Sequence, residues 1–499
     1  MAKTPRMSDD ERRRQDAEAK RTIICADCAR SDSLAHDLEP VDRMPIPTEA
    51  VAGFPDGVPK AKRYDRRSFL KWGVLGMASV YAAARIDWQQ AFESAVAEGA
   101  VPGSVLVCLY LNGGMDGLHL VVPTGTEYAT YQQKRPNLAR TLGPSVAGGA
   151  VGTTPIPGTN GQLGWANVAV AGTGNNNDTR GMDTIFGPGG GAPGADLAIF
   201  PAADYTPPNL SHFDSRDYWF AGALQKLQTG WLGRWLDVYG SQTNPLQAVS
   251  IDSSLSKQIR TVKAPVSAVS SLGGVNFQLD NNGGINATNE MSNLADNPVT
   301  PGNEHLARTR GAYGLTVQVS RALGGLAAPN AAAGGYPQSD LSRKLQIAAT
   351  LISAGLGTRV ITIDWGSFDS HGNQVGSVDP QLITLSRALA AFKADLAARG
   401  VEQNVVTLIF TEFGRRIASN ESGTDHGAGG PMMVMGSSVF GGIAADHPGV
   451  SAPDRNGDLR VTTDFRSVYQ AVIGEWLGGD PGAVLPGGPF PALATPLIG

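Results

Sequence analysis

The sequence has little charge, and neither sign dominates. Only 17% of its 499 residues are Asp, Glu, Lys or Arg, and the formal net charge is −5. No basic face or RNA-binding motif accompanies this mild acidity, so we expect no nucleic acid partner. Glycine is abundant instead, with 63 residues, which predicts long loops with tight turns rather than a helical bundle.

Cysteine is scarce as well. Cys25 and Cys28 form a C-x-x-C near the N-terminus, and Cys108 stands alone in an apolar run. A single C-x-x-C without a second pair is a weak sign of metal or redox chemistry, and an incidental pair in a flexible leader is the alternative. Cys108 is expected to be a small buried hydrophobe. The mature chain is therefore predicted to have no disulfide.

No apolar segment near the N-terminus is long enough for a stable transmembrane span. Residues 1–64 are polar, charged and interrupted by prolines, which predicts a flexible polar leader. DRRSFLK (residues 65–71) then precedes an apolar segment, residues 72–84, which is shorter than the ~20 residues of a membrane span. Paired arginines before a short apolar segment are typical of a twin-arginine export signal, which we place at residues 65–97.

Two A-x-A patterns offer alternative cleavage sites, one at Ala82 and Ala84 and the other at Ala95 and Ala97. Twin-arginine export carries folded proteins, often with a cofactor already loaded. We therefore expect the twin-arginine translocase as a transient partner, and the mature protein in the periplasm, at the cell surface or outside the cell. The alternative for the signal is an amphipathic helix with a basic start.

Near-continuous apolar runs recur along the mature chain, as expected for strands buried on both faces of a parallel sheet. They lie at residues 105–111, 197–200, 248–251, 360–363, 405–410 and 431–435. Apolar residues fall at helical spacing in residues 304–326, 341–354, 382–396 and 463–477. This alternation predicts one α/β domain over residues 98–499, with a mostly parallel sheet, helices on both faces and Gly-rich loop insertions.

Polar residues follow several of these runs, at the edge where open α/β sheets place their sites. Asp116 follows the first run, and Asp369 and His371 follow the fourth. In extended backbone, residues i and i+2 point the same way, so Asp369 and His371 can converge on one ion. Ser211 is a candidate helix N-cap, where terminal amides favour anions. Taken alone, Asp116 is better explained by a common Asp-Gly turn.

The loop after the fifth run carries the densest group of polar side chains. Glu412 ends the strand, Arg415 and Arg416 follow, and Asp425 and His426 stand between glycines. Carboxylate, guanidinium and imidazole groups together are the usual sign of a functional site. The alternative is a solvated loop whose histidine has no function.

LNGGMDGLH, NLSHF, FDSHGNQ and TEFGRR…GTDHG occur in this order after the twin-arginine leader. In these motifs the chain resembles an exported bacterial family, the domain-of-unknown-function 1501 family, which is related to the alkaline phosphatase and sulfatase superfamily. The resemblance covers essentially everything after the leader. It implies an alkaline-phosphatase-like fold for residues 98–499.

The resemblance also implies a metal site with a hydroxyl nucleophile at a helix start. By position, Asp116 resembles the first metal ligand and Ser211 the nucleophile. Asp369 and His371 resemble the ligands of the third motif, although their spacing is two residues instead of four. Divalent metal ions are implied, with zinc, manganese and calcium as candidates.

The last motif departs from the superfamily pattern. Glu412 and Phe413 replace the Asp-His pair at the strand end, and Asp425 and His426 lie in the following loop. His426 could replace the paired histidine or serve as the late one, for which His447 is a more distant candidate. The implied metal ligands are Asp116, Asp369, His371, Glu412, Asp425 and His426.

Arg415 or Arg416 would hold the equatorial oxygens of the substrate with its forked donors. For each arginine, a surface ion pair with Glu412 or Glu421 is the alternative. The resulting hypothesis is an exported, metal-dependent hydrolase of phosphate or sulfate esters that acts through a serine nucleophile on a small molecule or a surface polymer. The alternative is a catalytically degenerate envelope protein that binds a glycan, a lipid headgroup or a protein partner.

Overall fold

The computed structural model describes residues 79–81, 103–146, 150–188, 195–272 and 335–499, and six single residues between 310 and 326. Several sequence predictions lie outside these residues: the polar leader with its C-x-x-C, the paired arginines, both cleavage patterns and most of the helix predicted at 304–326. Within the predicted export signal, Ser79–Tyr81 forms strand β1.

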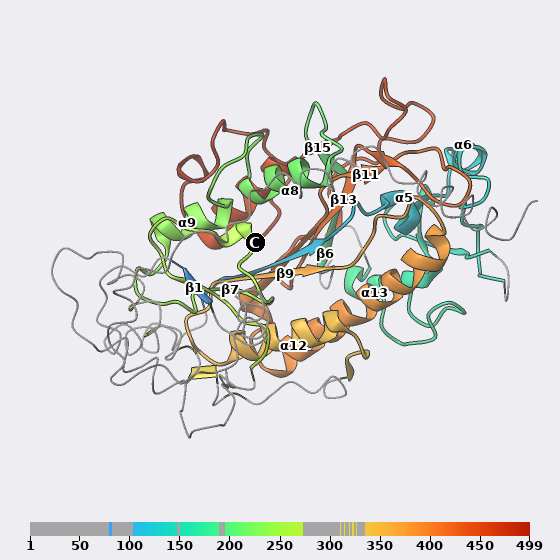
Figure 1. Cartoon of the computed structure of the whole chain (residues 1–499). Coiled ribbons are helices and arrows are strands. Elements are labelled where there is room, and N and C mark those ends of the chain that lie inside the picture. Colours follow the sequence, from blue (N-terminus) through green and yellow to red (C-terminus); the bar gives the residue numbers. More distant parts are fainter. Residues whose placement is uncertain are drawn as a thin grey trace, which may run out of the picture. The chain divides into compact units, whose positions relative to one another are not determined.

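A large mixed sheet forms the centre of the domain (Figure 1). Its strand order is β1 (Ser79–Tyr81), β8 (Val266–Ala268), β7 (Ala248–Ser250), β9 (Val360–Trp365), β2 (Val105–Leu111), β10 (Val405–Phe410), β13 (Gly430–Met435), β6 (Leu197–Asp204) and β14 (Gly442–Ile443), with β15 (Thr463–Asp464) also paired to β6. The pairs β1–β8, β10–β13 and β13–β6 are antiparallel. The other pairs described are parallel, which confirms a mostly parallel sheet.

Side chains of the central strands alternate between two hydrophobic layers. In β2, Val107 and Leu109 pack into the layer that contains α12 (Asp340–Ser353) and α13 (Gln374–Ala398). Cys108 packs into the opposite layer; the expectation that it is a buried, unpaired residue is confirmed. The strand is hydrophobic at every position because both of its faces are covered.

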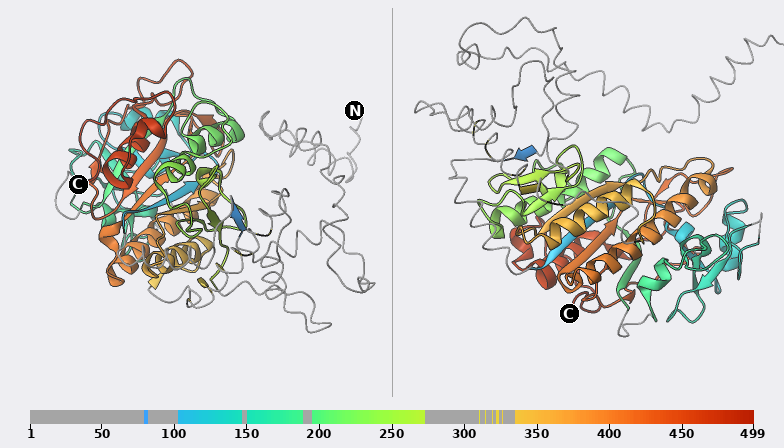
Figure 2. Two further views of the ribbon diagram at one scale, coloured as in Figure 1. Left: turned by 90° about the vertical axis from the view of Figure 1, so that its left-hand side faces the viewer. Right: turned by 90° about the horizontal axis from the view of Figure 1, so that it is seen from below.

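Helices cover both faces of the sheet, as the alternation predicts. On the Cys108 face lie α8 (His212–Ala221), α9 (Trp231–Tyr239) and α14 (Phe465–Ala471). Figure 2 shows α12 and α13, in gold and orange, side by side across the other face. Among the described residues, no helix is both long and apolar enough to cross a bilayer.

The segments between the main strands and helices contain short elements. A three-stranded antiparallel sheet forms in the order β3, β5, β4. The remaining elements are α5 (Gly117–Leu120), β3 (Val121–Pro123), α6 (Tyr128–Lys134), β4 (Thr153–Pro155), β5 (Leu163–Ala166), η2 (Asn167–Ala169), α7 (Met182–Phe186), η3 (Lys257–Ile259), η5 (Glu402–Asn404), β11 (Gly414–Arg415), β12 (His426–Gly427), η6 (Val472–Leu477) and η7 (Pro481–Ala483).

One helix boundary was predicted wrongly. The helix predicted at residues 382–396 begins eight residues earlier, at Gln374, and contains Pro380. Proline inside a helix removes a backbone donor and clashes with the preceding turn, so sequence rules start the helix after it. Here Pro380 lies in the second turn, and the helix continues back to the loop that follows β9.

The carboxyl ends of β9, β2 and β10 lie side by side. These strands are parallel neighbours, with Leu111 opposite Trp365 and Phe410 opposite Tyr110. The loops that follow them therefore leave the sheet at one edge, where open α/β sheets place their ligands.

Candidate metal centre

Two glycines after β2 allow the three loops to pack closely. Gly113 and Gly114 have φ angles of +112° and +71°. A Cβ on Gly113 would lie 2.5 Å from the Asp369 amide nitrogen, and one on Gly114 would lie 2.3 Å from the Phe413 ring. Because such contacts are sterically forbidden, only glycine fits at both positions.

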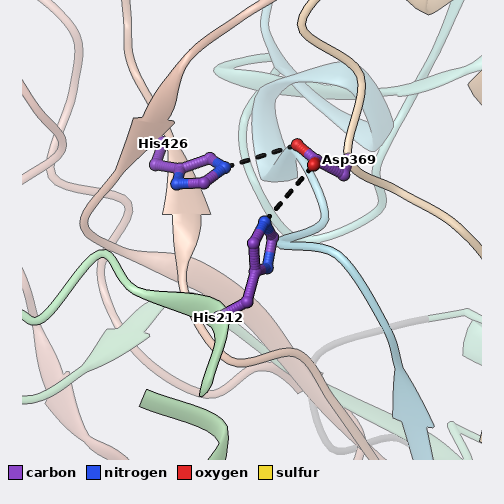
Figure 3. Close-up of side chains that lie close together, drawn as sticks. All are labelled: His212, Asp369 and His426. Carbon is purple, nitrogen blue, oxygen red and sulfur yellow. Dashed lines mark hydrogen bonds and ion pairs between the residues drawn. The ribbon is translucent and has the colours of Figure 1, made fainter. Parts of the chain in front are cut away.

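Three histidines surround the carboxylate of Asp369. The Nε2 atoms of His371 and His426 lie 3.1 and 3.3 Å from Asp369 Oδ1, and His212 Nε2 lies 3.4 Å from Oδ2. Figure 3 shows the rings of His212 and His426 directed at Asp369 from two sides. One ligand atom each from His212, Asp369 and His426 lies within 4.8 Å of the others, and His371 Nε2 is 3.1 Å from His426 Nε2.

The outer nitrogen of each ring is held by a hydrogen-bond acceptor. His212 Nδ1 lies 2.7 Å from Glu412 Oε1, His371 Nδ1 lies 2.9 Å from Asp425 Oδ1, and His426 Nδ1 lies 2.9 Å from the carbonyl oxygen of Leu210. A carbonyl or an ionised carboxylate can only accept, so each Nδ1 carries the proton. The second-sphere acceptors of metal-binding histidines fix ring orientation and tautomer in this way.

With each Nδ1 held outward, the Nε2 atoms of all three rings face one carboxylate. Two of these nitrogens face each other at 3.1 Å, and the Nε2 of His212 is shielded from solvent and has no hydrogen-bond partner among the described residues. Lone pairs at such distances repel one another unless a proton or a cation lies between them. The donor set therefore fits a metal ion, which His212, Asp369 and His426 could share.

The pKa values of Asp369 and His212 also show that the centre favours positive charge. Burial alone would raise the pKa of Asp369, but the three neighbouring histidines and Arg415 hold it far below its usual range. Burial opposes protonation of His212, yet the neighbouring carboxylates of Asp369 and Glu412 raise its pKa to about 9.

Two predicted ligands, Glu412 and Asp425, lie behind the histidines, outside the group that could share one ion. Glu412 is fully buried and also accepts from the Gly113 amide, with Oε1 3.0 Å away. Burial would raise its pKa, but the bond and charge of His212 lower it, so Glu412 stays ionised. The side chain of Asp425 is 57% exposed. Both carboxylates are placed to orient a ring.

Asp116 is engaged elsewhere. The Arg135 guanidinium forms two bonds to its carboxylate, at 2.5 and 3.0 Å, and Gln374 donates a third at 2.6 Å. Asp116 also caps α5 by accepting from the Leu118 amide. Burial would raise the pKa of Asp116, but the charge of Arg135 lowers it. Asp116 was predicted to be the first metal ligand, but its carboxylate is already bonded to the guanidinium of Arg135.

Arg415 holds the loops of the centre together. Its guanidinium donates to Asp369 Oδ1 at 2.8 Å and to backbone oxygens of Gly113, Gly114, Phe368 and Thr424. Its side chain is fully buried. In this arrangement Arg415 positions Asp369, whereas the predicted clamp on substrate oxygens would require donors that face the solvent.

The other candidates lie beside the centre or apart from it. Ser211 is the N-cap of α8 and directly precedes His212; its side chain makes no capping hydrogen bond. Arg416 donates to the Asn456 carbonyl oxygen at 2.7 Å. His447 accepts from the Gly449 amide in a separate turn, and burial lowers its pKa to about 4.

His212 is the residue that sequence reasoning missed. The motif NLSHF was noticed for Ser211, because the resemblance implies a hydroxyl nucleophile there. The available signal was the histidine in the next position, at the start of a helix that follows a strand of the same sheet. The start of α8 exposes the Ser211 hydroxyl, and it also fixes the direction of the His212 side chain.

Residues 221–464 match the sequence model of a family described as a protein of unknown function, DUF1501. This stretch contains Asp369, His371 and His426, while His212 lies just before it. No curated protein and no solved structure matches the chain. Similarity to the DUF1501 family is thus found for residues 221–464.

Proposed function

We propose that this protein is an exported, metal-dependent hydrolase of phosphate or sulfate esters. One observation carries the proposal: the Nε2 atoms of three histidines, each with its Nδ1 held by an acceptor, converge on the Asp369 carboxylate. Ser211, the implied nucleophile, is covalently adjacent to one of these histidines. The proposal includes the alkaline-phosphatase-like character of the fold, which the mostly parallel sheet and the position of the site support.

The ligand chemistry favours a single transition-metal ion. His212, His426 and Asp369 are the described residues that can share one ion, and His371 adds a third imidazole. Imidazole suits zinc, iron, copper and nickel, whereas calcium takes oxygen ligands. Zinc therefore fits best among the three expected metals, manganese is second, and calcium fits poorly. Asp116, which a second ion would need, is paired with Arg135.

The reaction would transfer a phosphoryl or sulfuryl group first to Ser211 and then to water. The Ser211 oxygen would form a bond to phosphorus or sulfur while the ester oxygen leaves as an alcohol, which takes up the serine proton. The metal, when bound, would supply positive charge that stabilises the oxygens of the transferred group. His212, whose ring is oriented by Glu412, and Asp369, which is oriented by Arg415, would keep that charge next to Ser211.

The test uses purified full-length protein, stripped with a chelator and reloaded with zinc, manganese or calcium. We expect zinc to restore turnover of aryl phosphate or aryl sulfate, and Ser211→Ala to lower kcat by about 10³-fold or more with metal affinity unchanged. Ser254→Ala, at an exposed position, is the matched control and should retain activity. A metal-loaded protein inert toward both ester classes would contradict the proposal.

The structure contains a feature that favours the alternative, a binding protein without catalysis. The donors of Arg415 are directed at Asp369 and at backbone oxygens, so this arginine cannot clamp an anion in the present arrangement. In that case the centre would hold a metal for ligand binding alone. Ser211→Ala would then leave binding of a glycan, lipid headgroup or protein partner intact, whereas a large loss in this variant would favour the enzyme.

Export by the twin-arginine translocase is part of the proposal and rests on the sequence of residues 65–97. Replacement of Arg66 and Arg67 by lysine should retain the precursor in the cytoplasm, because the translocase reads the arginine pair. Cell fractionation with an antibody against the protein measures this. Unchanged export of the double variant would contradict the signal.

A further inference from the structure

A polar cavity lies next to the candidate metal centre. It has a volume of about 230 Å³, and its lining residues are Tyr110, Asn112, Arg216, Asp340, Asp364, Trp365 and Gly366. These come from the carboxyl ends of β2 and β9, from the start of α12 and from α8. The volume is below the ~300 Å³ at which pockets for drug-sized ligands begin, so the cavity suits one small chemical unit.

Two links place the cavity beside the metal centre. Arg216 follows His212 by four residues on α8, so both side chains lie on the same face of the helix, one turn apart. On the opposite side, burial and the carboxylate of Glu412 raise the pKa of the Tyr110 phenol. Since Glu412 holds the His212 ring, a ligand in the cavity would lie one side chain away from the centre.

The cavity offers unsatisfied groups of both hydrogen-bonding types. The Oδ1 of Asp364 is shielded from solvent and has no hydrogen-bond partner among the described residues. Burial, with the charge of Asp252, raises the pKa of Asp364 to about 6. Arg216 lies over the Phe213 ring, 5.8 Å from its centroid, and its guanidinium makes no hydrogen bond with a described residue. Asp364 on one wall can therefore accept a hydrogen bond, and Arg216 on the other wall can donate one.

These groups select the class of ligand. An inorganic anion only accepts hydrogen bonds and would be repelled by Asp364 and Asp340, whereas a cation would be repelled by Arg216. A hydroxyl both donates and accepts, so a ring with several hydroxyls can satisfy Asp364, Arg216 and the Asn112 amide at once. The apolar face of such a ring also suits aromatic side chains, and Trp365 lines the cavity.

We infer that this cavity binds a single sugar ring, the alcohol part of the ester that the neighbouring centre hydrolyses. The inference rests on the proposed function, because it assigns the substrate class of the same site. Arg216 accordingly determines specificity: it donates to ring hydroxyls and does not contact the transferred group. The hydrolase would act on sugar phosphates or sugar sulfates in preference to aryl esters.

The test compares kcat/KM of the zinc-loaded protein for glucose 6-phosphate and glucose 6-sulfate with that for the 4-nitrophenyl esters. We expect Arg216→Met to lower the sugar-to-aryl ratio by about 10–100-fold, the usual contribution of a hydrogen bond to a charged group. Arg460→Met, at an exposed position, is the control and should leave the ratio unchanged. Thermal unfolding of each variant monitors the fold.

A second measurement separates this inference from the function on which it rests. Glucose binding to the zinc-loaded protein is followed by saturation-transfer NMR, and Asp364→Asn, which preserves shape, should weaken it together with Arg216→Met. If kcat/KM were equal for sugar and aryl esters, and Arg216→Met did not change their ratio, the sugar subsite would be overturned. The proposed hydrolase would not be affected. Absence of all ester turnover, with glucose binding lost in both variants, would overturn the hydrolase but support the sugar subsite.

Discussion

Two clusters of described residues combine aspartate and histidine, and they differ in which groups hold the aspartate and the rings. In one, Asp379 receives a bond from His119 Nε2 at 2.8 Å and two from the guanidinium of Arg140, at 2.5 and 3.0 Å. The arginine supplies the cation, and burial with the charge of Arg140 lowers the pKa of His119, so His119 donates as a neutral ring. The cluster is complete without a ligand.

The second cluster differs at the outer nitrogens of its rings. Around Asp369 the Nδ1 atoms of the histidines are bonded outward and the Nε2 atoms face inward. Arg415 donates to Oδ1 of the carboxylate, but His212 points at Oδ2 and its Nε2 has no hydrogen-bond partner among the described residues. In both clusters Nε2 faces the aspartate. The difference is an acceptor on Nδ1, which each histidine around Asp369 has and His119 lacks among the described residues.

The largest expected effect is a loss of stability when a buried aspartate loses its arginine, which tests the kind of pairing seen in the first cluster. Arg135→Met removes the guanidinium from buried Asp116, which an arginine holds as Arg140 holds Asp379. We expect a loss of about 3–5 kcal/mol in the free energy of unfolding, because an unpaired buried carboxylate remains. Urea unfolding of the metal-free protein measures it. Arg460→Met, at an exposed position, should change stability by less than about 0.5 kcal/mol; equal losses would remove the distinction.

Removing a histidine from the second cluster should have the opposite signature. His212→Ala is expected to weaken zinc binding by more than about 100-fold, since it removes a ligand that second-sphere changes only perturb. Stability of the metal-free protein should fall less than in Arg135→Met, because buried Glu412 keeps its bonds from the Gly113 amide and the Thr411 hydroxyl. Competition with a chromophoric chelator gives the affinity. His447→Ala is the matched control, and a similar loss in that variant would disprove the assignment.

A smaller effect should come from the residues behind the rings. Glu412→Gln preserves the shape but removes the charge that holds His212 Nδ1, so zinc affinity should fall by about 10–100-fold. Asp425→Asn should lower zinc affinity less, because this side chain is 57% exposed and water can accept the hydrogen bond of His371 in its place. The same chelator competition applies. Identical affinities for wild type and Glu412→Gln would show that ring orientation does not depend on this carboxylate.

The smallest effect concerns acid. Burial opposes ionisation, but bonds from His119 and Arg140 lower the pKa of Asp379 to about 2. Because the folded pKa lies below the unfolded value of 3.8, Asp379 contributes about 2 kcal/mol above pH 4, and this is lost as the pH falls toward 2. Zinc, in contrast, should leave at a higher pH, as protons compete with the metal for the imidazole nitrogens of the centre.

The two pH midpoints can be measured on one sample, with zinc release followed by a dye and stability by urea unfolding. Asp379→Asn should lower stability at pH 6 and match wild type near pH 2. Coincident loss of zinc and of the Asp379 contribution would mean that the clusters are not independent.

Much of the fold is predictable from sequence because burial on both faces leaves uninterrupted apolar runs. β2 and β10 have the predicted bounds, Val105–Leu111 and Val405–Phe410. The start of α13 was predicted wrongly, because Pro380 satisfies the rule for a helix start. Asp369 and His371 were predicted to converge from their i, i+2 spacing, and the structure places them 3.1 Å apart.

The rest of the centre depends on contacts that are distant in sequence. Asp116 and Asp369 both follow buried strands, and only the position of Arg135, on the loop after α6, distinguishes them. His212 joins the centre because α8 begins where the loop carrying Glu412 ends, and Ser215 donates to the Glu412 carbonyl oxygen. Such pairings across ~200 positions leave no periodic or local signal in the sequence.

The central claim is that Asp369 and its histidines form a metal centre. Its most direct test is elemental analysis of zinc-reconstituted protein beside the His212→Ala/His426→Ala double variant, after both have passed through a chelating column. We predict one zinc ion per chain in the wild type, as one group of ligands allows, and none above background in the double variant. Equal zinc content in the two proteins, or none in either, would contradict the claim.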